Sequence, residues 1–262
     1  MLTNKEIKLY SSLQLKKFRK EHQLFIVEGV RNLTTAAESG LSPEIILVSK
    51  DELPKVNNLL PAYKKQKVKI EEVDQKTIER ITSTENPQGI CGIFPFFTKS
   101  EADFFVLLPK QTIYLDNIND PGNLGTILRT ADWFGFNNIV LSNGCADVYN
   151  PKTVRSAMGS LFNLRLFQIE DDDSFLHKAT ADNRYKVIST GTGGEPLSNI
   201  ILPEPFILVF SNEANGTSNS VQEKAAKCVA VQGFGKAESL NVAVAAGIIL
   251  HTLKLQNIKE LL

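Results

Sequence analysis

The segment NDPGNLGTILRTADWFGF, residues 119–136, joins a turn to an amphipathic helix and guides the interpretation of the whole chain. The turn Asp120–Asn123 disfavours regular structure, and apolar side chains then recur at helical spacing up to Gly135, which is placed to end the helix. Asn123 is expected to cap this helix, whose free N-terminal amides offer a site for an anion. Arg129 lies off the apolar stripe, so it faces the turn or the solvent.

Short apolar runs typical of strands alternate with helical patterns along most of the chain. This alternation predicts an α/β fold, in which helices cover a parallel or mixed sheet. A looser stretch over residues 95–110 interrupts the pattern, so we expect two domains: residues 1–98 and 111–262, joined by a linker at 99–110. Helices are expected over 52–60, 218–226 and 240–255. The last of these is rich in small residues and is expected to pack closely on the sheet or on a partner subunit.

The net charge of the 262 residues is zero and neither indicates nor excludes a nucleic acid. Basic residues are nevertheless concentrated near the N-terminus. In the first twenty residues only Glu6 opposes six basic side chains: Lys5, Lys8, Lys16, Lys17, Arg19 and Lys20. Such a run is either a solvated helix face or a patch that binds phosphate.

The cysteines do not indicate a metal site or a disulfide framework. Cys91, Cys145 and Cys228 lie far apart, form no CxxC pair and have no histidine at ligand spacing. The N-terminal residues lack the apolar core of a signal peptide, and the longest apolar run, 242–250, is too short to span a bilayer. We therefore expect a cytoplasmic protein without a metal and without a membrane segment.

Three segments are expected at strand ends, where open α/β sheets bind ligands. The first is the turn before Arg129. The second, FILVFSNEANGTS at 206–218, passes from a buried strand to Asn212 and Glu213, and Ser220 with Glu223 has the spacing of a capping box. The third, VQGFGKAESLNVAVAAG at 231–247, places Ser239 as a helix cap and Asn241 in the first helical turn. Taken singly, each segment fits an ordinary capped helix or an ordinary loop as well as a site.

The glycines of the first segment do not match the common nucleotide-binding loops. Gly122 and Gly125 fit neither the dinucleotide-binding pattern nor a phosphate-binding Walker loop, which disfavours a dinucleotide-binding metabolic enzyme. The same pair is reminiscent of the clamp of a KH module, but a strand precedes it here.

The three segments taken together resemble the three motifs of the SpoU/TrmH family of RNA 2′-O-ribose methyltransferases. The resemblance rests on Asn123 with Arg129, Asn212 with Glu213, and Ser239–Asn241, in this order and at the spacing of the family. The stretch NPKTVRSAMGSLF at 150–162, which includes Arg155, is similar to the family's connecting segment. KKFRKEHQLFIVEGVRNL at 16–33 and, more weakly, NPQGICGIF at 86–94 resemble its accessory RNA-binding domain.

The resemblance implies a C-terminal parallel α/β domain with a deep trefoil knot and a smaller N-terminal α/β domain of ribosomal-protein-like RNA-binding fold. It further implies a homodimer with the final helix at the interface and S-adenosylmethionine held in the knot. By position, the residues expected to contact the cofactor are Thr190, Gly191, Ser211, Asn212, Gly216, Val231 and Leu240. This chain departs from the family at two places: Ser211 replaces the usual glycine, and Val231-Gln232-Gly233 replaces Ile-Pro-Met. Both replacements are expected to affect the affinity for the cofactor.

The resemblance makes Arg129 the centre of catalysis. Because a guanidinium stays protonated at neutral pH, we expect it to bind an RNA phosphate and to stabilise the developing alkoxide. Asn123 would orient the arginine or the ribose, and Glu213 would anchor the arginine or the knot loops. Ser239 and Asn241 would position the arginine or the substrate.

The expected partner is a structured RNA, with ribosomal RNA favoured over transfer RNA. The side chains expected to contact it are Lys16, Lys17, Arg19, Lys20, Arg31 and Arg155. The alternative is an RNA-binding protein that kept the knotted scaffold without its activity. The presence of all five motif residues argues against that alternative, because a degenerate site would have lost some of them.

Overall fold

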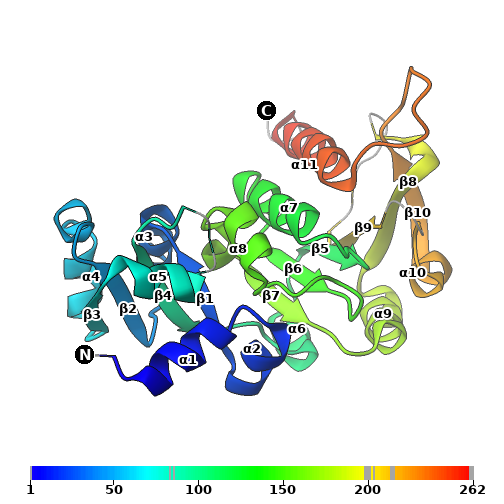
Figure 1. Ribbon diagram of the computed structural model, residues 1–262. Helices are drawn as coiled ribbons and strands as arrows, with labels where there is room; N and C mark the ends of the chain where they lie inside the picture. The colour runs from blue at the N-terminus through cyan, green and yellow to red at the C-terminus, as the bar shows by residue number, and fades with distance from the viewer. Residues whose placement is uncertain are drawn as a thin grey trace. The chain divides into compact units, whose positions relative to one another are not determined.

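The computed structural model describes residues 2–82, 84, 86–197, 202, 204–212 and 216–259. For residues 257–259 it describes the backbone alone. The chain divides into two compact units, whose helices and strands are labelled in Figure 1. Unit 1 comprises Met1–Phe97 and Asp147–Asn163, and unit 2 comprises Thr98–Ala146 and Leu164–Leu262. Both units are α/β, as the alternation of patterns predicts.

Unit 1 is built on a mixed sheet of four strands in the order β1-β4-β2-β3. The strands are β1 (Leu24–Glu28), β2 (Ile45–Ser49), β3 (Lys69–Val73) and β4 (Ile90–Pro95). β4 runs antiparallel to β1 and β2, whereas β2 and β3 are parallel. Helices α1 (Asn4–Ser12) and α5 (Gln75–Thr82) pack on one face of this sheet through a cluster that includes Leu13, Ile26 and Ile78.

The remaining elements of unit 1 are α2 (Lys16–His22), α3 (Val30–Glu38), η1 (Leu53–Val56) and α4 (Leu60–Lys65), together with α8 (Pro151–Ala157) and η2 (Ser160–Asn163). The helix predicted over 52–60 is therefore wrong in its bounds, because Pro54 and Pro61 allow only the short η1 and then the first turn of α4.

Aromatic side chains hold α8 and η2 in unit 1. Tyr149 stacks on Phe96 with ring centroids 4.0 Å apart and lies 4.5 Å from the ring of Phe25. Phe162 lies 5.3 Å from Phe94, and the hydroxyl of Tyr149 accepts a hydrogen bond from the backbone N–H of Phe97. Residues 147–163 thus belong to the hydrophobic core of unit 1, although both neighbouring parts of the chain belong to unit 2.

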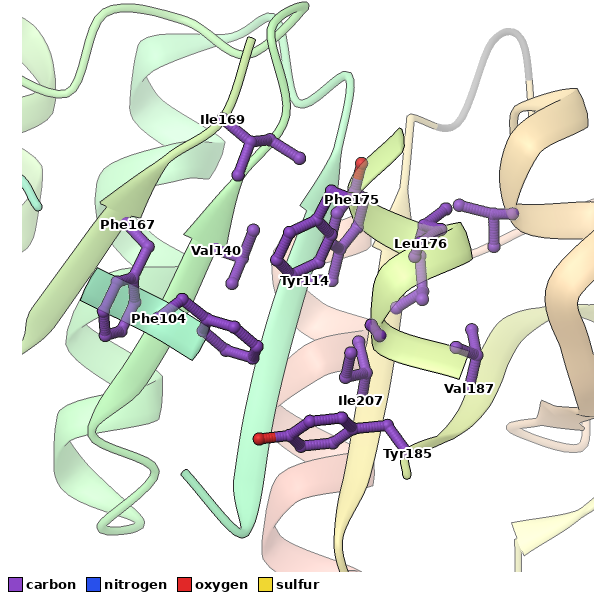
Figure 2. Close-up of a cluster of buried hydrophobic side chains, with 13 residues drawn as sticks. Phe104, Tyr114, Val140, Phe167, Ile169, Phe175, Leu176, Tyr185, Val187 and Ile207 are labelled. Atoms are coloured by element: carbon purple, nitrogen blue, oxygen red, sulfur yellow. The ribbon is translucent and has the colours of Figure 1, made fainter. Parts of the chain in front are cut away.

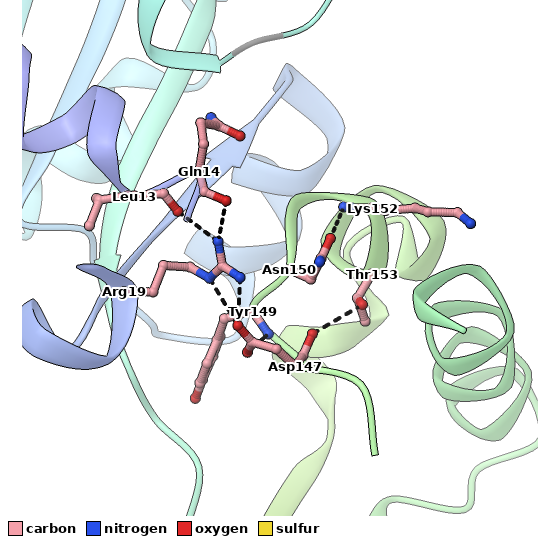
Figure 3. A network of polar contacts seen from close by, with 8 residues as sticks. All are labelled: Leu13, Gln14, Arg19, Asp147, Tyr149, Asn150, Lys152 and Thr153. Atoms are coloured by element: carbon pink, nitrogen blue, oxygen red, sulfur yellow. Dashed lines mark hydrogen bonds and ion pairs between the residues drawn. The ribbon is translucent and has the colours of Figure 1, made fainter. Parts of the chain in front are cut away.

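A buried ion pair reinforces this packing (Figure 3). Arg19 is 1% exposed, and its Nε and Nη2 both donate to Oδ2 of Asp147, at 3.0 and 2.6 Å. Its Nη1 donates to the carbonyl oxygens of Leu13 and Gln14. All three nitrogens of the guanidinium are therefore bonded within unit 1.

Unit 2 is built on a sheet of six parallel strands in the order β10-β8-β9-β5-β6-β7. The strands are β5 (Gln111–Asp116), β6 (Asn138–Leu141), β7 (Arg165–Gln168), β8 (Lys186–Pro196), β9 (Phe206–Ser211) and β10 (Ala225–Ala230). The helices are α6 (Glu101–Leu107), α7 (Pro121–Trp133), α9 (Asp172–Thr180), η3 (Ala181–Asn183), α10 (Asn219–Lys224) and α11 (Val242–Lys259). Because all six strands are parallel, their carboxyl ends meet at one edge of the sheet.

Helices α6, α9 and α10 cover one face of this sheet (Figure 2). Phe104 of α6 meets the rings of Phe167, Phe175 and Tyr185 at centroid distances of 5.1–5.6 Å. The stretch predicted to be a linker thus contains a helix, α6, which begins with a capping box between Ser100 and Asp103.

Helix α11 packs along α7, and the two helices run in the same direction. Gly247 lies opposite Thr130, and one turn later the ring of His251 lies 5.6 Å from that of Phe134. Further along, Lys254 places its Nζ 4.4 Å from the ring centre of Phe136. The small side chains near the start of α11 allow this close approach, but its main neighbour is α7, whereas the prediction named the sheet or a partner subunit.

Three predicted helix caps are wrong. Asp120, rather than Asn123, caps α7 by accepting from the N–H of Asn123 at 2.8 Å, with Pro121 in the first turn. Asn241, rather than Ser239, caps α11, because its Oδ1 accepts from the N–H of Ala243 at 3.0 Å. α10 begins at Asn219 without the predicted capping box of Ser220 and Glu223, and it ends two residues before 226.

We predict that Arg19→Ala lowers the free energy of unfolding by about 3 kcal/mol, because removal of one partner leaves the buried carboxylate of Asp147 without its cation. Urea denaturation followed by circular dichroism measures the loss, and hydrogen exchange of β1 amides shows that it arises in unit 1. Lys20→Ala is the matched control: this neighbouring side chain is exposed, and its removal should change stability by less than about 0.5 kcal/mol.

The double variant Arg19→Met, Asp147→Leu removes both charges and should recover part of that stability. An Arg19→Ala protein as stable as the Lys20→Ala control would show that the ion pair does not hold unit 1 together.

Candidate functional site

The three predicted segments all reach the carboxyl edge of the sheet in unit 2. α7 follows β5, the segment that begins at Asn212 follows β9, and the segment from residue 231 follows β10 and leads into α11. Residues more than a hundred positions apart in the chain are therefore neighbours at this edge.

A hydrogen bond joins the first and third segments directly. The Nδ2 of Asn241 donates to the Oδ1 of Asn123 at 3.1 Å. The orientation of the Asn241 amide is fixed, since its Oδ1 accepts from the first turn of α11. Among the described residues, the Nδ2 of Asn123 has no partner of its own and can bind a ligand.

Arg129 lies two turns further along α7 on the exposed face of that helix. Among the residues that the structure describes, its guanidinium has no hydrogen-bond or ion-pair partner. Thr126 and Trp133 lie on the same face at helical spacing, and Trp133 is 83% exposed. An exposed arginine without a partner is free to bind an anionic ligand.

The second segment is fixed to the first by buried polar contacts around Asp116, the last residue of β5. Asp116 is fully buried, and its Oδ2 accepts from the hydroxyl of Ser211 at 3.1 Å and from the N–H of Ser218 at 2.8 Å. Its carbonyl oxygen accepts from the N–H of Asn212 at 3.2 Å. The Nδ2 of Asn212 donates to the carbonyl oxygen of Asn117 at 3.1 Å.

Asn119 completes these contacts when its amide is turned so that its oxygen and nitrogen face suitable partners. Its Nδ2 then donates to the carbonyl oxygens of Asn117 and Gly144, at 2.7 and 2.8 Å, and its Oδ1 accepts from Asn212. Glu213, the predicted acid of this segment, lies outside the described residues.

Sequence reasoning missed Asp116, Asn117 and Asn119. The available signal was an aspartate that ends the apolar strand TIYLD. Nothing in the sequence shows that this carboxylate meets Ser211 and Ser218, because those partners are about a hundred residues away.

The predicted cofactor residues of β8 lie within the strand rather than at its end. β8 continues to Pro196, but its pairing with β10 is interrupted: Cys228 pairs with Ser189, and the next residue, Val229, pairs with Glu195. Thr190 and Gly191 begin this irregular stretch, and the hydroxyl of Thr190 donates to the carbonyl oxygen of Val209. The hydroxyl of Thr190 is thus directed to β9.

The third segment offers backbone groups without partners. Residues 232–241 are exposed, and the backbone of 231–240 makes no hydrogen bond with any residue that the structure describes. Leu240 is 44% exposed, and Ser239 is exposed beside it. Gly216, in the second segment, has a φ of +66°, and no described residue lies within 4 Å of the place that a Cβ would take.

Cys145 lies near the same edge but has no nucleophilic role. Its Sγ donates to the carbonyl oxygen of Leu115 at 3.0 Å. Burial raises the pKa of this thiol to about 11, so it stays protonated at neutral pH.

Unit 1 presents five of the six predicted RNA-binding side chains to solvent. The exposed residues are Lys16, Lys17 and Lys20 on α2, Arg31 on α3 and Arg155 on α8. Arg19 is an exception, and its prediction requires correction. It lies on the inner side of the same short helix, and its ion pair with Asp147 leaves none of its three nitrogens for a phosphate.

Neither a metal centre nor a membrane span is found in the described parts of the chain. No group of three or more histidine, cysteine, aspartate or glutamate side chains there is arranged to bind a metal ion. None of the helices described is both long enough and apolar enough to cross a bilayer.

Comparison with known families matches both parts of the sequence. Residues 110–251 match the SpoU rRNA Methylase family, and residues 4–92 match the MRM3-like substrate binding domain.

Relatives of similar length carry related activities. The chain is 32% identical to the 23S rRNA (guanosine(2553)-2′-O)-methyltransferase RlmP of Bacillus subtilis, over 96% of each chain. It is 28% identical to the 23S rRNA (uridine(2479)-2′-O)-methyltransferase of Streptomyces viridochromogenes, over 89% of this chain and 83% of that protein.

A solved structure agrees with these matches. The AdoMet-bound rRNA methyltransferase from Sinorhizobium meliloti superposes with a TM-score of 0.85 at 30% identity, over 98% of this chain and 96% of that one. Because the family model covers more than half of the chain and RlmP aligns along nearly all of it, this protein belongs to the SpoU rRNA methylase family.

Proposed function

We propose that this protein transfers the methyl group of S-adenosylmethionine to a ribose 2′-hydroxyl of ribosomal RNA. The observation that carries the proposal is the hydrogen bond between Asn123 and Asn241, which joins the first and third motifs at the start of the helix that also carries Arg129. Membership of the SpoU family and relatives that act on 23S rRNA support the reaction and the class of substrate.

The residues at the carboxyl edge fit S-adenosylmethionine. The unbonded backbone of residues 231–240 can contact the adenosine and methionine groups, and the exposed Leu240 offers an apolar surface for the adenine. Ser211, Asn212 and Gly216 would bound the cofactor on the side of β9, with Val231 and the Thr190–Gly191 stretch nearby. When bound, the cofactor supplies a methyl group that its sulfonium already activates.

The protein must then align the ribose oxygen and manage one proton. Arg129 binds a phosphate of the RNA through its planar fork and stabilises the negative charge that develops on the 2′-oxygen. The available Nδ2 of Asn123 orients the ribose, and Asn241 holds Asn123 in place. Ser239, two residues before Asn241, is proposed to position the same substrate, and the role proposed for Glu213 is to anchor Arg129 or the neighbouring loop.

We infer that the chain is knotted at this edge. β10 is an edge strand of the sheet, yet the cap of α11, Asn241, contacts Asn123, which follows β5 and so lies beyond β8 and β9. Residues 231–241 therefore cross the carboxyl ends of those two strands. An experimental structure that traces this crossing relative to the chain between β8 and β9 tests the knot.

We infer that the active form is a homodimer joined through α7 and α11. Val244, Ile248 and Leu255 are 51, 39 and 47% exposed, and they form a stripe on α11. Since α7 and α11 are parallel, this stripe faces the same way as Trp133 and Arg129 on α7. An apolar surface of this kind is typical of an interface, and a second copy seated on it would adjoin Arg129.

The exposed basic residues of unit 1 are proposed to bind the RNA backbone. Lys16, Lys17 and Lys20 project from one short helix, and Arg31 and Arg155 add charge on α3 and α8. All three cysteines are free, which fits a reducing compartment, so we infer that the reaction takes place in the cytoplasm. Cell fractionation tests that location.

We predict that Arg129→Lys lowers the methylation rate at least about a hundredfold, because one ammonium cannot reproduce the fork that holds phosphate and oxyanion. Incubation of ribosomal RNA with the labelled cofactor and mapping of the 2′-O-methyl group measure the rate. The matched control is Arg184→Lys, at another exposed arginine of unit 2, which should leave the rate unchanged. Turnover of Arg129→Lys close to that of the control would remove Arg129 from the mechanism.

We predict that Val244→Asp converts the dimer into a monomer, because a carboxylate would lie in the apolar stripe when two copies meet. Sedimentation equilibrium gives the molecular mass. Val106→Asp is the matched control, at a valine that is 85% exposed on α6, and it should leave the dimer intact. A wild-type protein that sediments as a monomer would exclude the proposed interface.

We predict that replacing Lys16, Lys17 and Lys20 by glutamine weakens RNA binding and reduces the slope of log affinity against log salt concentration by about 1 for each phosphate that is no longer neutralised. Filter binding at several salt concentrations measures both quantities. The control replaces Lys64, Lys65 and Lys67 of the same unit, which are equally exposed. Equal slopes for the two triple variants would mean that α2 does not touch the backbone of the RNA.

A further inference from the structure

The segment that follows β9 is fastened at both of its ends to one carboxylate. Before the segment, the hydroxyl of Ser211 donates to Oδ2 of Asp116 at 3.1 Å. After it, the N–H of Ser218 donates to the same oxygen at 2.8 Å. The two described ends of this loop, Ser211 and Ser218, are therefore held together by a single oxygen atom.

Further hydrogen bonds fix the first residue of this loop. The N–H of Asn212 donates to the carbonyl oxygen of Asp116 at 3.2 Å, and its Nδ2 donates to that of Asn117 at 3.1 Å. The N–H of Gly216 returns to the carbonyl oxygen of Asn212 at 2.9 Å. The position of Asn212 is thus set from β5, the strand that leads into the turn before α7.

The chemical character of Asp116 suits this task. It is fully buried, and the Nδ2 of Asn117 donates to its other oxygen, Oδ1, at 2.8 Å. A buried carboxylate must have its lone pairs satisfied, and hydrogen bonds to an ionised acceptor are stronger than those between neutral groups. Three donors, from the strand end of β5, the strand end of β9 and the start of α10, meet this requirement together.

We infer that Asp116 is a positioning residue for the cofactor, acting through Asn212 and Gly216, which lie between the two residues that its carboxylate holds. This inference rests on the proposed function, because Asn212 and Gly216 of the loop are proposed to bound S-adenosylmethionine. Asp116 itself does not touch the cofactor. It keeps Ser211 and Ser218 together before the cofactor binds, so that binding does not have to bring these two ends together.

Two substitutions separate the hydrogen bonds of Asp116 from its charge. Asp116→Ala removes the acceptor for both Ser211 and Ser218. Asp116→Asn keeps one carbonyl oxygen that can accept from both, while it removes the charge and the oxygen that accepts from Asn117. The matched control is Asp172→Ala, which removes a second carboxylate of unit 2. Asp172 is partly buried, and it accepts a hydrogen bond of 2.7 Å from the hydroxyl of Tyr114 rather than from the loop.

The experiment combines calorimetric titration with S-adenosylmethionine, thermal unfolding, and hydrogen exchange of residues 212–218 in the protein without cofactor. We expect Asp116→Ala to bind the cofactor at least about tenfold more weakly and to exchange the Ser218 amide faster. Asp116→Asn should stay within about threefold of the wild-type affinity, since the conservative variant retains both ends of the loop. Asp172→Ala should be destabilised yet bind the cofactor as the wild type does.

Each other outcome overturns the inference. Wild-type affinity in Asp116→Ala would show that the loop does not need this carboxylate. Equal losses in Asp116→Asn and Asp116→Ala would show that charge, rather than the fastening of the loop, matters. An equal loss in Asp172→Ala would reduce the role of Asp116 to general stability. Failure of the proposed function is distinct, because then the wild-type protein itself would neither bind the cofactor nor methylate RNA.

Discussion

The parallel packing of α11 on α7 is the constraint on which the proposed site depends. The two helices begin 121 residues apart in the chain, yet Gly247 lies opposite Thr130 and His251 lies opposite Phe134. This register brings the cap of α11, Asn241, to Asn123 in the first turn of α7. One packing interaction therefore both assembles two motifs and turns the exposed stripe of α11 to the same side as Arg129.

The buried carboxylate of Asp116 brings the second motif to the same edge by a different kind of force. Helix packing is apolar and tolerates small shifts, whereas hydrogen bonds to an ionised oxygen have narrow limits of distance and angle. Asn212 and Ser218, near the two ends of the loop after β9, are therefore held more strictly in direction than packing alone would hold them. The site combines an apolar contact that selects which elements meet with polar contacts that fix how their loops lie.

The sequence predicted the architecture well because strands and helices depend on local patterns. The apolar runs indicated the strands of both sheets, and the stripe of Leu124, Ile127, Leu128 and Ala131 indicated the buried face of α7. The caps were predicted less well: Asn123, Ser239 and Ser220 all have suitable side chains, but a neighbouring residue begins the helix in each case. Helix boundaries depend on one or two hydrogen bonds, which composition alone does not decide.

Arg19 illustrates a further limit of sequence reasoning. Together with Lys16, Lys17 and Lys20 it forms a basic run that is typical of a phosphate-binding patch. In a helix, however, the side chains of such a run point in different directions, and one of them can face the core. Whether that member is tolerated depends on a partner, and here the partner, Asp147, lies 128 residues away. A buried arginine can be recognised only when the carboxylate that neutralises it is known.

The position of Asp147 also changes how the two matched regions of the sequence are understood. Residues 147–163 lie inside the region that matches the SpoU family, 110–251, yet they pack with β1, α2 and α3 in unit 1. Tyr149 and Phe162 are part of the aromatic core of that unit. The core of unit 1 is therefore completed by a segment that follows the first motif, Asn123 with Arg129, in the chain. Arg155 is carried on this segment, and any RNA bound through it is held by the substrate-binding unit. A fragment that ends at Phe97 would lack the aromatic rings and the carboxylate that this core requires.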